Sequence, residues 1–308
     1  MKSVAIAVLV LQNASLALLI KYTQQHTHTA HVRIQLLLAE FIKVLLGFAA
    51  HWWNYGEFKL CNMYIPLSQT VRCSVPVGLY IVQNNLSFHA AKLLPVAIFQ
   101  ALVQLKLMFA AVFAVVFLNK SMNREQWFSL LFIVCGAAVV CLDDRGCEST
   151  TQQQHSVTGI VTAVSITMLS GFTGCYTEKI LKTQNVCPWI QSSLIAAMSA
   201  LCLICALAYE HAFDTTSTLR EGFLANFTPL VWLLVFNLSA GGFLVVLVIK
   251  LMGNVIKGIA VVISLLVSSA MSTFLFDAPF SMLLSIGIVL ICSATYQYTK
   301  ATASQTHL

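Results

Sequence analysis

Amide and lysine side chains occur inside segments of this chain that are otherwise apolar enough to cross a bilayer. Gln83, Asn84 and Asn85 follow one another in one such segment, and Gln100 and Lys106 lie in the next. A lysine at mid-membrane is disfavoured by about 2.5–3.5 kcal/mol, so polar groups there usually face a cavity, an ion path or another helix. Amides bind the edges of bases and sugars, and a lysine attracts phosphate as a point charge. These residues predict a polar cavity for an anionic solute with many hydrogen-bonding groups.

The second of these segments is expected to carry a polar stripe. Phe99 and Lys106 are seven residues apart, and on a helix of 3.6 residues per turn they share one face. Gln100 and Gln104 lie on the adjoining arc. We expect this stripe to line the cavity. The structural alternative is that the glutamines bridge to other helices and that Lys106 neutralises an acid.

Glu40 is the acid that lies well inside an apolar segment, and Lys43 follows it within pairing distance on a helix. We interpret Glu40 as the residue that positions Lys43 toward the cavity. A salt bridge that locks helix packing is an equal alternative. Because Glu40 already has this partner, Lys106 has no obvious intramembrane carboxylate, which favours a phosphate on the solute as its partner.

A second lysine has the position expected of an anion ligand. Lys257 follows Asn254 in the first turn of an expected helix. A lysine there opposes the helix macrodipole unless an anion is present, and the N–H groups of a helix start also point outward. We therefore predict a phosphate near Lys257, with a cytosolic anchor residue as the alternative. Lys106 and Lys257 together would form one anion site.

Two further features of the segment 157–178 leave alternatives open. Gly171 and Gly174 let backbones come close, which serves either helix packing or the approach of a ligand. Glu178 and Lys179 stand at the end of the segment, where a gate and a solvated pair fit equally well.

The composition indicates a polytopic membrane protein. Of the 308 residues, 58% are hydrophobic and 9% are charged, whereas soluble domains carry about 25% charged residues. The ten cysteines are scattered, and the one Cys-x-x-Cys pair, Cys202 and Cys205, lies in an apolar run that favours helix packing over zinc or redox chemistry. Neither a phosphate loop, a dinucleotide-binding turn nor a catalytic constellation is present. We predict no enzyme activity, no catalytic residue, no metal, no cofactor and no nucleic-acid binding.

Hydropathy predicts an all-α membrane protein with ten transmembrane helices. They are expected at residues 4–20, 34–50, 71–91, 95–118, 126–142, 157–178, 189–209, 230–251, 255–276 and 282–298. We interpret the first as a retained helix and not a signal peptide. With both termini cytosolic, ten basic residues lie at cytosolic ends and five at opposite ends. This bias favours cytosolic termini.

The two halves of the chain also show a weak sequence similarity that suggests an internal repeat. In each half a long segment ends in Phe-Leu, at Phe117 and at Phe274, before a short polar turn and another apolar segment. This similarity predicts two five-helix halves, residues 1–148 and 149–308. An odd number of spans per half gives inverted repeats, which place a substrate near the midplane between the halves.

Several motifs resemble those of the pyrimidine nucleotide-sugar transporters of the UDP-galactose, UDP-N-acetylglucosamine and CMP-sialic acid type, within the drug/metabolite transporter superfamily. They lie at Ala39–Leu46, Tyr80–His89, Phe99–Lys106, Ser170–Lys182 and Asn254–Gly258. The resemblance implies exchange of a cytosolic pyrimidine nucleotide-sugar for a lumenal nucleoside monophosphate in the Golgi membrane, or second the ER membrane. A UDP-sugar is favoured over CMP-sialate.

The resemblance also implies roles for single residues. Lys106 and Lys257 would hold phosphate with Lys43 in support, Phe99 would stack, and the base or sugar would be contacted by Gln83, Asn84 and Gln100. Gly174 and Ser192 complete the expected substrate contacts, and Glu40, Glu178 and Lys179 are expected to have structural or gating roles.

The chain departs from the family pattern at Phe99 and Val103, which replace tyrosines, and at Ser192, which replaces an asparagine. These changes favour a shifted sugar or base preference, and loss of transport is also compatible with them. Alternatives are export of another small solute, or a non-transporting scaffold of the same fold. Further expected partners are membrane lipid and either a second copy of the chain or a glycosyltransferase.

Overall fold

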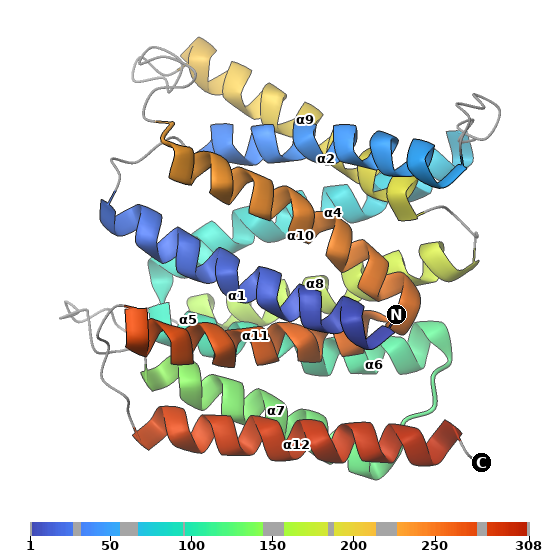
Figure 1. Ribbon diagram of the computed structural model, residues 1–308, viewed down its shortest axis with the longest axis vertical. Helices are drawn as coiled ribbons and strands as arrows, with labels where there is room; N and C mark the ends of the chain where they lie inside the picture. The colour runs from blue at the N-terminus through green and yellow to red at the C-terminus, as the bar shows by residue number, and fades with distance from the viewer. Residues whose placement is uncertain are drawn as a thin grey trace. The chain divides into compact units, whose positions relative to one another are not determined.

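The computed structural model describes residues 2–26, 32–55, 67–94, 96–143, 157–183, 188–213, 227–275 and 282–306. Within these ranges the side chains of Asn84, Asn85 and a few other residues are outside the description. All regular secondary structure in the described chain is helical (Figure 1). Its helices are α1 (Lys2–His26), α2 (Val32–Tyr55), α4 (Leu67–Leu93), α5 (Val96–Val103), α6 (Lys106–Leu118), α7 (Arg124–Asp143), α8 (Val157–Thr183), α9 (Pro188–Phe213), α10 (Pro229–Met252), α11 (Asn254–Leu275) and α12 (Met282–Thr306).

The helices confirm an all-α membrane protein. Eight helical stretches of the described chain are long and apolar enough to cross a membrane. A helix suits such a sequence because hydrocarbon offers no hydrogen bonds, so the backbone must satisfy its own. The predicted spans 34–50 and 71–91 are helical, as α2 and α4, but are not among the eight. The predicted count of ten spans is therefore not confirmed.

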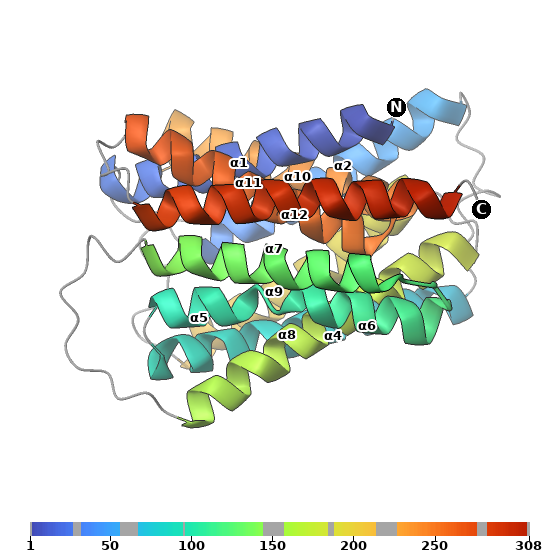
Figure 2. The same ribbon diagram turned by 90° about the horizontal axis from the view of Figure 1, so that it is seen from below.

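The predicted span 95–118 is found as one membrane-length stretch over residues 98–118, but its helix is interrupted. It divides into α5 and α6, which follow one another in nearly the same direction (Figure 2). Between them the bonds tighten to three-residue spacing, since Gln104 N–H donates to the carbonyl of Ala101 and Leu105 N–H to that of Leu102. Such a stretch breaks the regular stripe expected for Phe99 and Lys106.

The chain folds into two compact units. Unit 1 comprises Met1–Val77 and Ile180–Leu251, and unit 2 comprises Gly78–Lys179 and Met252–Leu308. Each unit is therefore assembled from two separate stretches of the sequence. The predicted halves 1–148 and 149–308 describe an internal repeat and remain a prediction.

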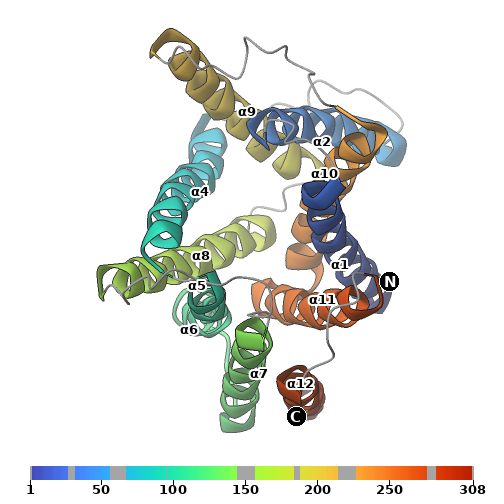
Figure 3. The same cartoon turned by 90° about the vertical axis from the view of Figure 1, so that its left-hand side faces the viewer.

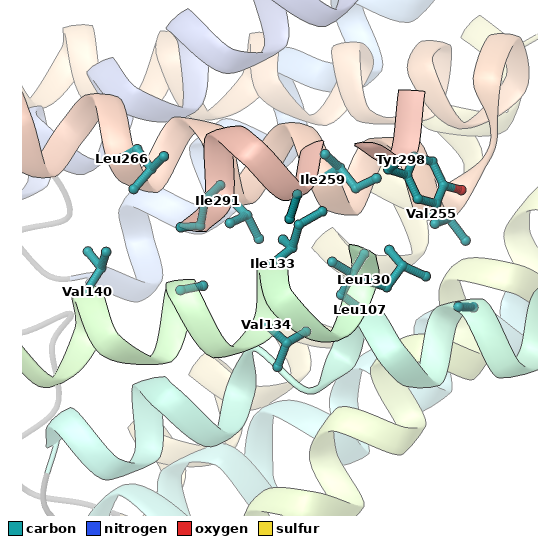
Figure 4. Packing of buried hydrophobic residues seen from close by; sticks show 14 of the residues in the cluster. Leu107, Leu130, Ile133, Val134, Val140, Val255, Ile259, Leu266, Ile291 and Tyr298 are labelled. Atoms are coloured by element: carbon teal, nitrogen blue, oxygen red, sulfur yellow. The ribbon is translucent and has the colours of Figure 1, made fainter. Parts of the chain in front are cut away.

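Unit 2 is held by a cluster of apolar side chains from α6, α7, α11 and α12 (Figure 4). Figure 3 shows α12 beside α7, in agreement with Figure 2. Gly136 on α7 permits the approach, because a Cβ there would lie 2.8 Å from the Cγ1 atom of Ile291. Ile291 is completely buried.

Replacing Ile291 by alanine should destabilise unit 2 by about 2–5 kcal/mol, since truncating a buried side chain leaves a cavity. The measurement is the midpoint of thermal unfolding of the detergent-solubilised protein at a fixed scan rate. Val289→Ala is the matched control on the same helix, because Val289 is 66% exposed and leaves no cavity. Equal losses in the two variants would contradict the observed packing.

Candidate functional site

A half-open cavity lies inside unit 2, between α6, α8 and α11. Its volume is about 310 Å³ when the space at its open side is included. The polar and glycine positions in its lining are Lys106, Ser170, Gly171, Asn254, Lys257 and Gly258. The structure thus brings together the two lysines that the sequence predicts for one anion site.

The two ammonium groups give the cavity its chemistry. Lys106 and Lys257 are both partly buried, and within the described residues neither ammonium group has a hydrogen-bond acceptor or a carboxylate partner. Two like charges in a confined, partly desolvated space disfavour one another. An anion between them would relieve both the repulsion and the loss of hydration.

Lys106 is placed by the break between α5 and α6. It is the first residue of α6, and the tight turn before it ends with Leu107 N–H donating to the Gln104 carbonyl. Gln104 is buried, and its amide donates to the Sγ atom of Cys141 at 3.7 Å. Gln104 therefore bonds to a neighbouring helix, which agrees with the alternative that the glutamines bridge helices.

Lys257 is placed by the start of α11. Gly253 has φ +97°, a conformation that favours glycine, and its carbonyl accepts the N–H of Lys257 at 3.2 Å. The N–H of Asn254 donates to Glu178 Oε2 at 2.7 Å. The anion at this helix start is therefore a protein carboxylate, and the helix dipole alone does not require a phosphate there.

Glu178 and Lys179 do not form a solvated pair. Glu178 is completely buried, while Lys179 is exposed. The carboxylate of Glu178 pairs instead with Lys120 across 2.6 Å. Sequence reasoning missed Lys120, because its partner lies 58 residues further along the chain and no local spacing indicates the pair.

The glycines of α8 serve close packing. A Cβ at Gly171 would lie 2.8 Å from the backbone nitrogen of Ala110 on α6. At Gly174 it would collide with the side chain of Asn254. Gly171 lines the cavity and also packs against α6, whereas the space beside Gly174 is filled by protein.

Glu40 and Lys43 form the expected ion pair in unit 1, with 2.6 Å between Lys43 Nζ and Glu40 Oε1. Lys43 packs on α10, where a Cβ at Gly242 would lie 2.6 Å from its Cδ atom. The second oxygen of Glu40, Oε2, is buried and has no hydrogen-bond partner within the described chain. The ion pair fits both the positioning and the packing interpretation, and Lys43 is not among the residues that line the cavity of unit 2.

The remaining predicted contacts lie in varied surroundings. The carbonyl oxygen of Gln83 is buried without a hydrogen-bond partner in the described chain, and the side chain of Asn84 lies outside the described residues. Phe99 packs against an apolar cluster of unit 2, and Gln100 is exposed. Ser192 is buried on α9 in unit 1. Gln83, Phe99, Gln100 and Ser192, whose side chains are described, do not line the cavity of the two lysines.

Comparison with known proteins identifies relatives over nearly the whole chain. The UDP-galactose translocators of Mus musculus and Homo sapiens are each 33% identical over 97% of this chain, and the matches cover 78% and 77% of those proteins. The UDP-N-acetylglucosamine transporter of Rattus norvegicus is 27% identical, over 97% of this chain and 95% of that protein.

A solved crystal structure superposes with a TM-score of 0.72 over 97% of each chain. Its sequence identity is 17%, so it shows likeness of fold alone. The family model for nucleotide-sugar transporters matches residues 1–299. The chain belongs to the nucleotide-sugar transporter family.

Proposed function

We propose that the protein is an antiporter that exchanges a cytosolic UDP-sugar for lumenal UMP across the Golgi membrane. The observation that carries the proposal is one cavity lined by Lys106 and Lys257, in a chain of this family. The relatives named above carry UDP-galactose and UDP-N-acetylglucosamine in their names, which supports a UDP-sugar over CMP-sialate. The protein is then a transporter and not an enzyme, and it needs no cofactor.

The shared chemistry of the two solutes explains how one site serves both. A nucleotide-sugar and a nucleoside monophosphate each present a phosphate beside the same nucleoside. Lys106 and Lys257 bind the phosphate as point charges, and the family resemblance assigns the base or sugar to Gln83, Asn84 and Gln100. Lys43 takes a supporting role through its pairing with Glu40.

The charge of the cavity explains why transport would be an exchange. An empty protein that changes its access must carry two unpaired ammonium groups through a partly desolvated state. A bound phosphate neutralises them and favours the loaded protein in that step. Return without a solute is therefore slow, and solute on the far side accelerates uptake.

The orientation follows from the basic residues. With both termini in the cytosol, ten lysines and arginines lie at the cytosolic ends of the ten predicted spans and five at the lumenal ends, as the positive-inside rule expects. The cavity lysines then bind the nucleotide-sugar on its way from the cytosol to the lumen and the nucleoside monophosphate on its way back.

Liposomes that contain the purified protein should take up labelled UDP-galactose or UDP-N-acetylglucosamine several-fold faster when preloaded with UMP. Lys106→Ala should lose this acceleration, because one of the two phosphate-binding charges is removed. Lys300→Ala, at an exposed position of α12, is the matched control and should keep it. If no nucleotide inside the liposomes stimulates uptake, export of a different solute or a scaffold role replaces the proposal.

UMP should also raise the thermal unfolding midpoint of the detergent-solubilised protein. A ligand at a hundredfold excess over its Kd stabilises the folded state by about 2.7 kcal/mol. We expect UMP to act at lower concentration than CMP, GMP or AMP, and Lys257→Ala to abolish the effect. A stronger shift with GMP or AMP would contradict the pyrimidine assignment, and a full shift in Lys257→Ala would remove this lysine from the site.

A further inference from the structure

We propose that Glu178 is a positioning residue for substrate binding: its carboxylate fixes the start of α11 and thereby holds Lys257 in the cavity. This inference rests on the proposed function, because Lys257 is taken to bind the phosphate. Glu178 itself does not line the cavity and acts through α11.

The contacts of Glu178 join three parts of unit 2. Its Oε1 atom accepts a hydrogen bond from Lys120 Nζ at 2.6 Å, and its Oε2 atom accepts one from the N–H of Asn254 at 2.7 Å. Lys120 lies between α6 and α7, and Asn254 is the first residue of α11. One buried side chain of α8 therefore ties these two segments together.

Both partners follow a residue of unusual backbone conformation. Asn119, with φ 51°, precedes Lys120, and Gly253, with φ 97°, precedes Asn254; these are the two positive φ values in the described chain. Each ends a helix, α6 and α10, in the left-handed conformation typical of helix C-termini. A Cβ at Gly253 would lie 2.7 Å from both Glu178 Oε1 and Lys120 Nζ, so the carboxylate occupies the space that glycine leaves.

The same stretch of α8 also holds the side chain of Asn254. Its amide donates to Cys175 Sγ at 3.8 Å, and the missing side chain of Gly174 leaves room for it. Glu178 lies four residues after Gly174 and three after Cys175, so on α8 it is a neighbour of both along the helix surface. Asn254 is thus fixed at its backbone and at its side chain.

The position of Asn254 determines that of Lys257. The two residues are three positions apart on α11 and both line the cavity. Gly253 accepts the N–H of Lys257, so the first turn of the helix transmits the anchor directly. If Glu178 no longer accepts the N–H of Asn254, the first turn frays and the ammonium group of Lys257 loses its fixed place opposite Lys106.

Charge neutralisation and N–H acceptance can be separated by mutation. Lys120 and Glu178 form an ion pair in which Glu178 is completely buried and Lys120 is 33% exposed. Removing one charge leaves the other unpaired, whereas removing both avoids that penalty. Lys120→Met with Glu178→Gln keeps an oxygen that accepts the Asn254 N–H. Lys120→Met with Glu178→Leu fills a similar volume without an acceptor.

The experiment compares these two double variants with the unaltered protein in UMP binding and in exchange kinetics. The double variant of Lys120→Met with Glu178→Gln is called here the Glu178→Gln pair, and that of Lys120→Met with Glu178→Leu the Glu178→Leu pair. We expect the Glu178→Gln pair to keep the Kd for UMP within about twofold. The Glu178→Leu pair should raise this Kd about tenfold, equivalent to about 1.4 kcal/mol. The Glu178→Leu pair should raise KM while the exchange rate at saturating solute is largely kept. Thr302→Val, which removes a hydrogen bond to Gln126 in the same unit, is the control and should change neither.

A measurement without ligand separates this inference from the proposed function. Lys257 and Lys106 are acylated with an amine-reactive reagent, and the ratio of their modification rates is followed by mass spectrometry. We expect the ratio to change in the Glu178→Leu pair and to stay constant in the Glu178→Gln pair and in Thr302→Val. If the unaltered protein binds no nucleotide, the proposed function fails, and the acylation ratio alone then decides whether Glu178 positions Lys257.

Glu178→Asp serves where the double variants do not fold. It keeps the charge beside Lys120 but withdraws the carboxylate by one methylene, so the Asn254 N–H loses its acceptor. The expected result is a weaker affinity for UMP and an altered acylation ratio. The inference is overturned if the Glu178→Leu pair or the Glu178→Asp variant folds and keeps both its affinity for UMP and its acylation ratio unchanged.

Discussion

The interaction on which the rest of the site depends is the repulsion between two ammonium groups in one confined cavity. Lys106 and Lys257 both line it, and neither has a carboxylate partner within the described chain. Holding such charges out of water is costly, and a specific backbone conformation fixes the position of each lysine. A tight turn precedes Lys106. Before Lys257, Gly253 adopts a positive φ and the buried carboxylate of Glu178 accepts the N–H of Asn254. The protein maintains an unfavourable arrangement that becomes favourable when an anion arrives.

In unit 1, by contrast, the lysine of α2 has a carboxylate partner. Lys43 is paired with Glu40 at 2.6 Å, and adjacent glycines of α10 give room to polar neighbours on two sides. Gly242 admits the side chain of Lys43, and Gly241 admits Gln12, whose amide donates to the Asn237 side chain at 2.9 Å. Lysine charge is neutralised within the protein in unit 1, whereas the two lysines of the cavity in unit 2 have no carboxylate partner in the described chain, and we propose a solute for that role. This contrast is why Lys43 receives a supporting role.

Sequence reasoning found the parts of the site that follow from composition and local chemistry. Lysines in apolar segments are visible without a structure, and both line one cavity as expected. The break before Lys106 could not be predicted, because residues 96–118 contain neither proline nor glycine and tertiary context overrides the helical pattern. The Lys120–Glu178 pair has no local signature either. Without that pair, the sequence argument required a phosphate at the start of α11, where Glu178 already provides the negative charge.

The lining of the lysine cavity separates two properties of a carrier that are usually discussed as one. On the proposed function this cavity holds the phosphorylated end of the solute, and the departures from the family pattern at Phe99, Val103 and Ser192 all lie outside its lining. On that proposal, binding of the anion and choice of the sugar rest on different side chains. A substitution that alters the choice of cargo then need not weaken the electrostatic anchor.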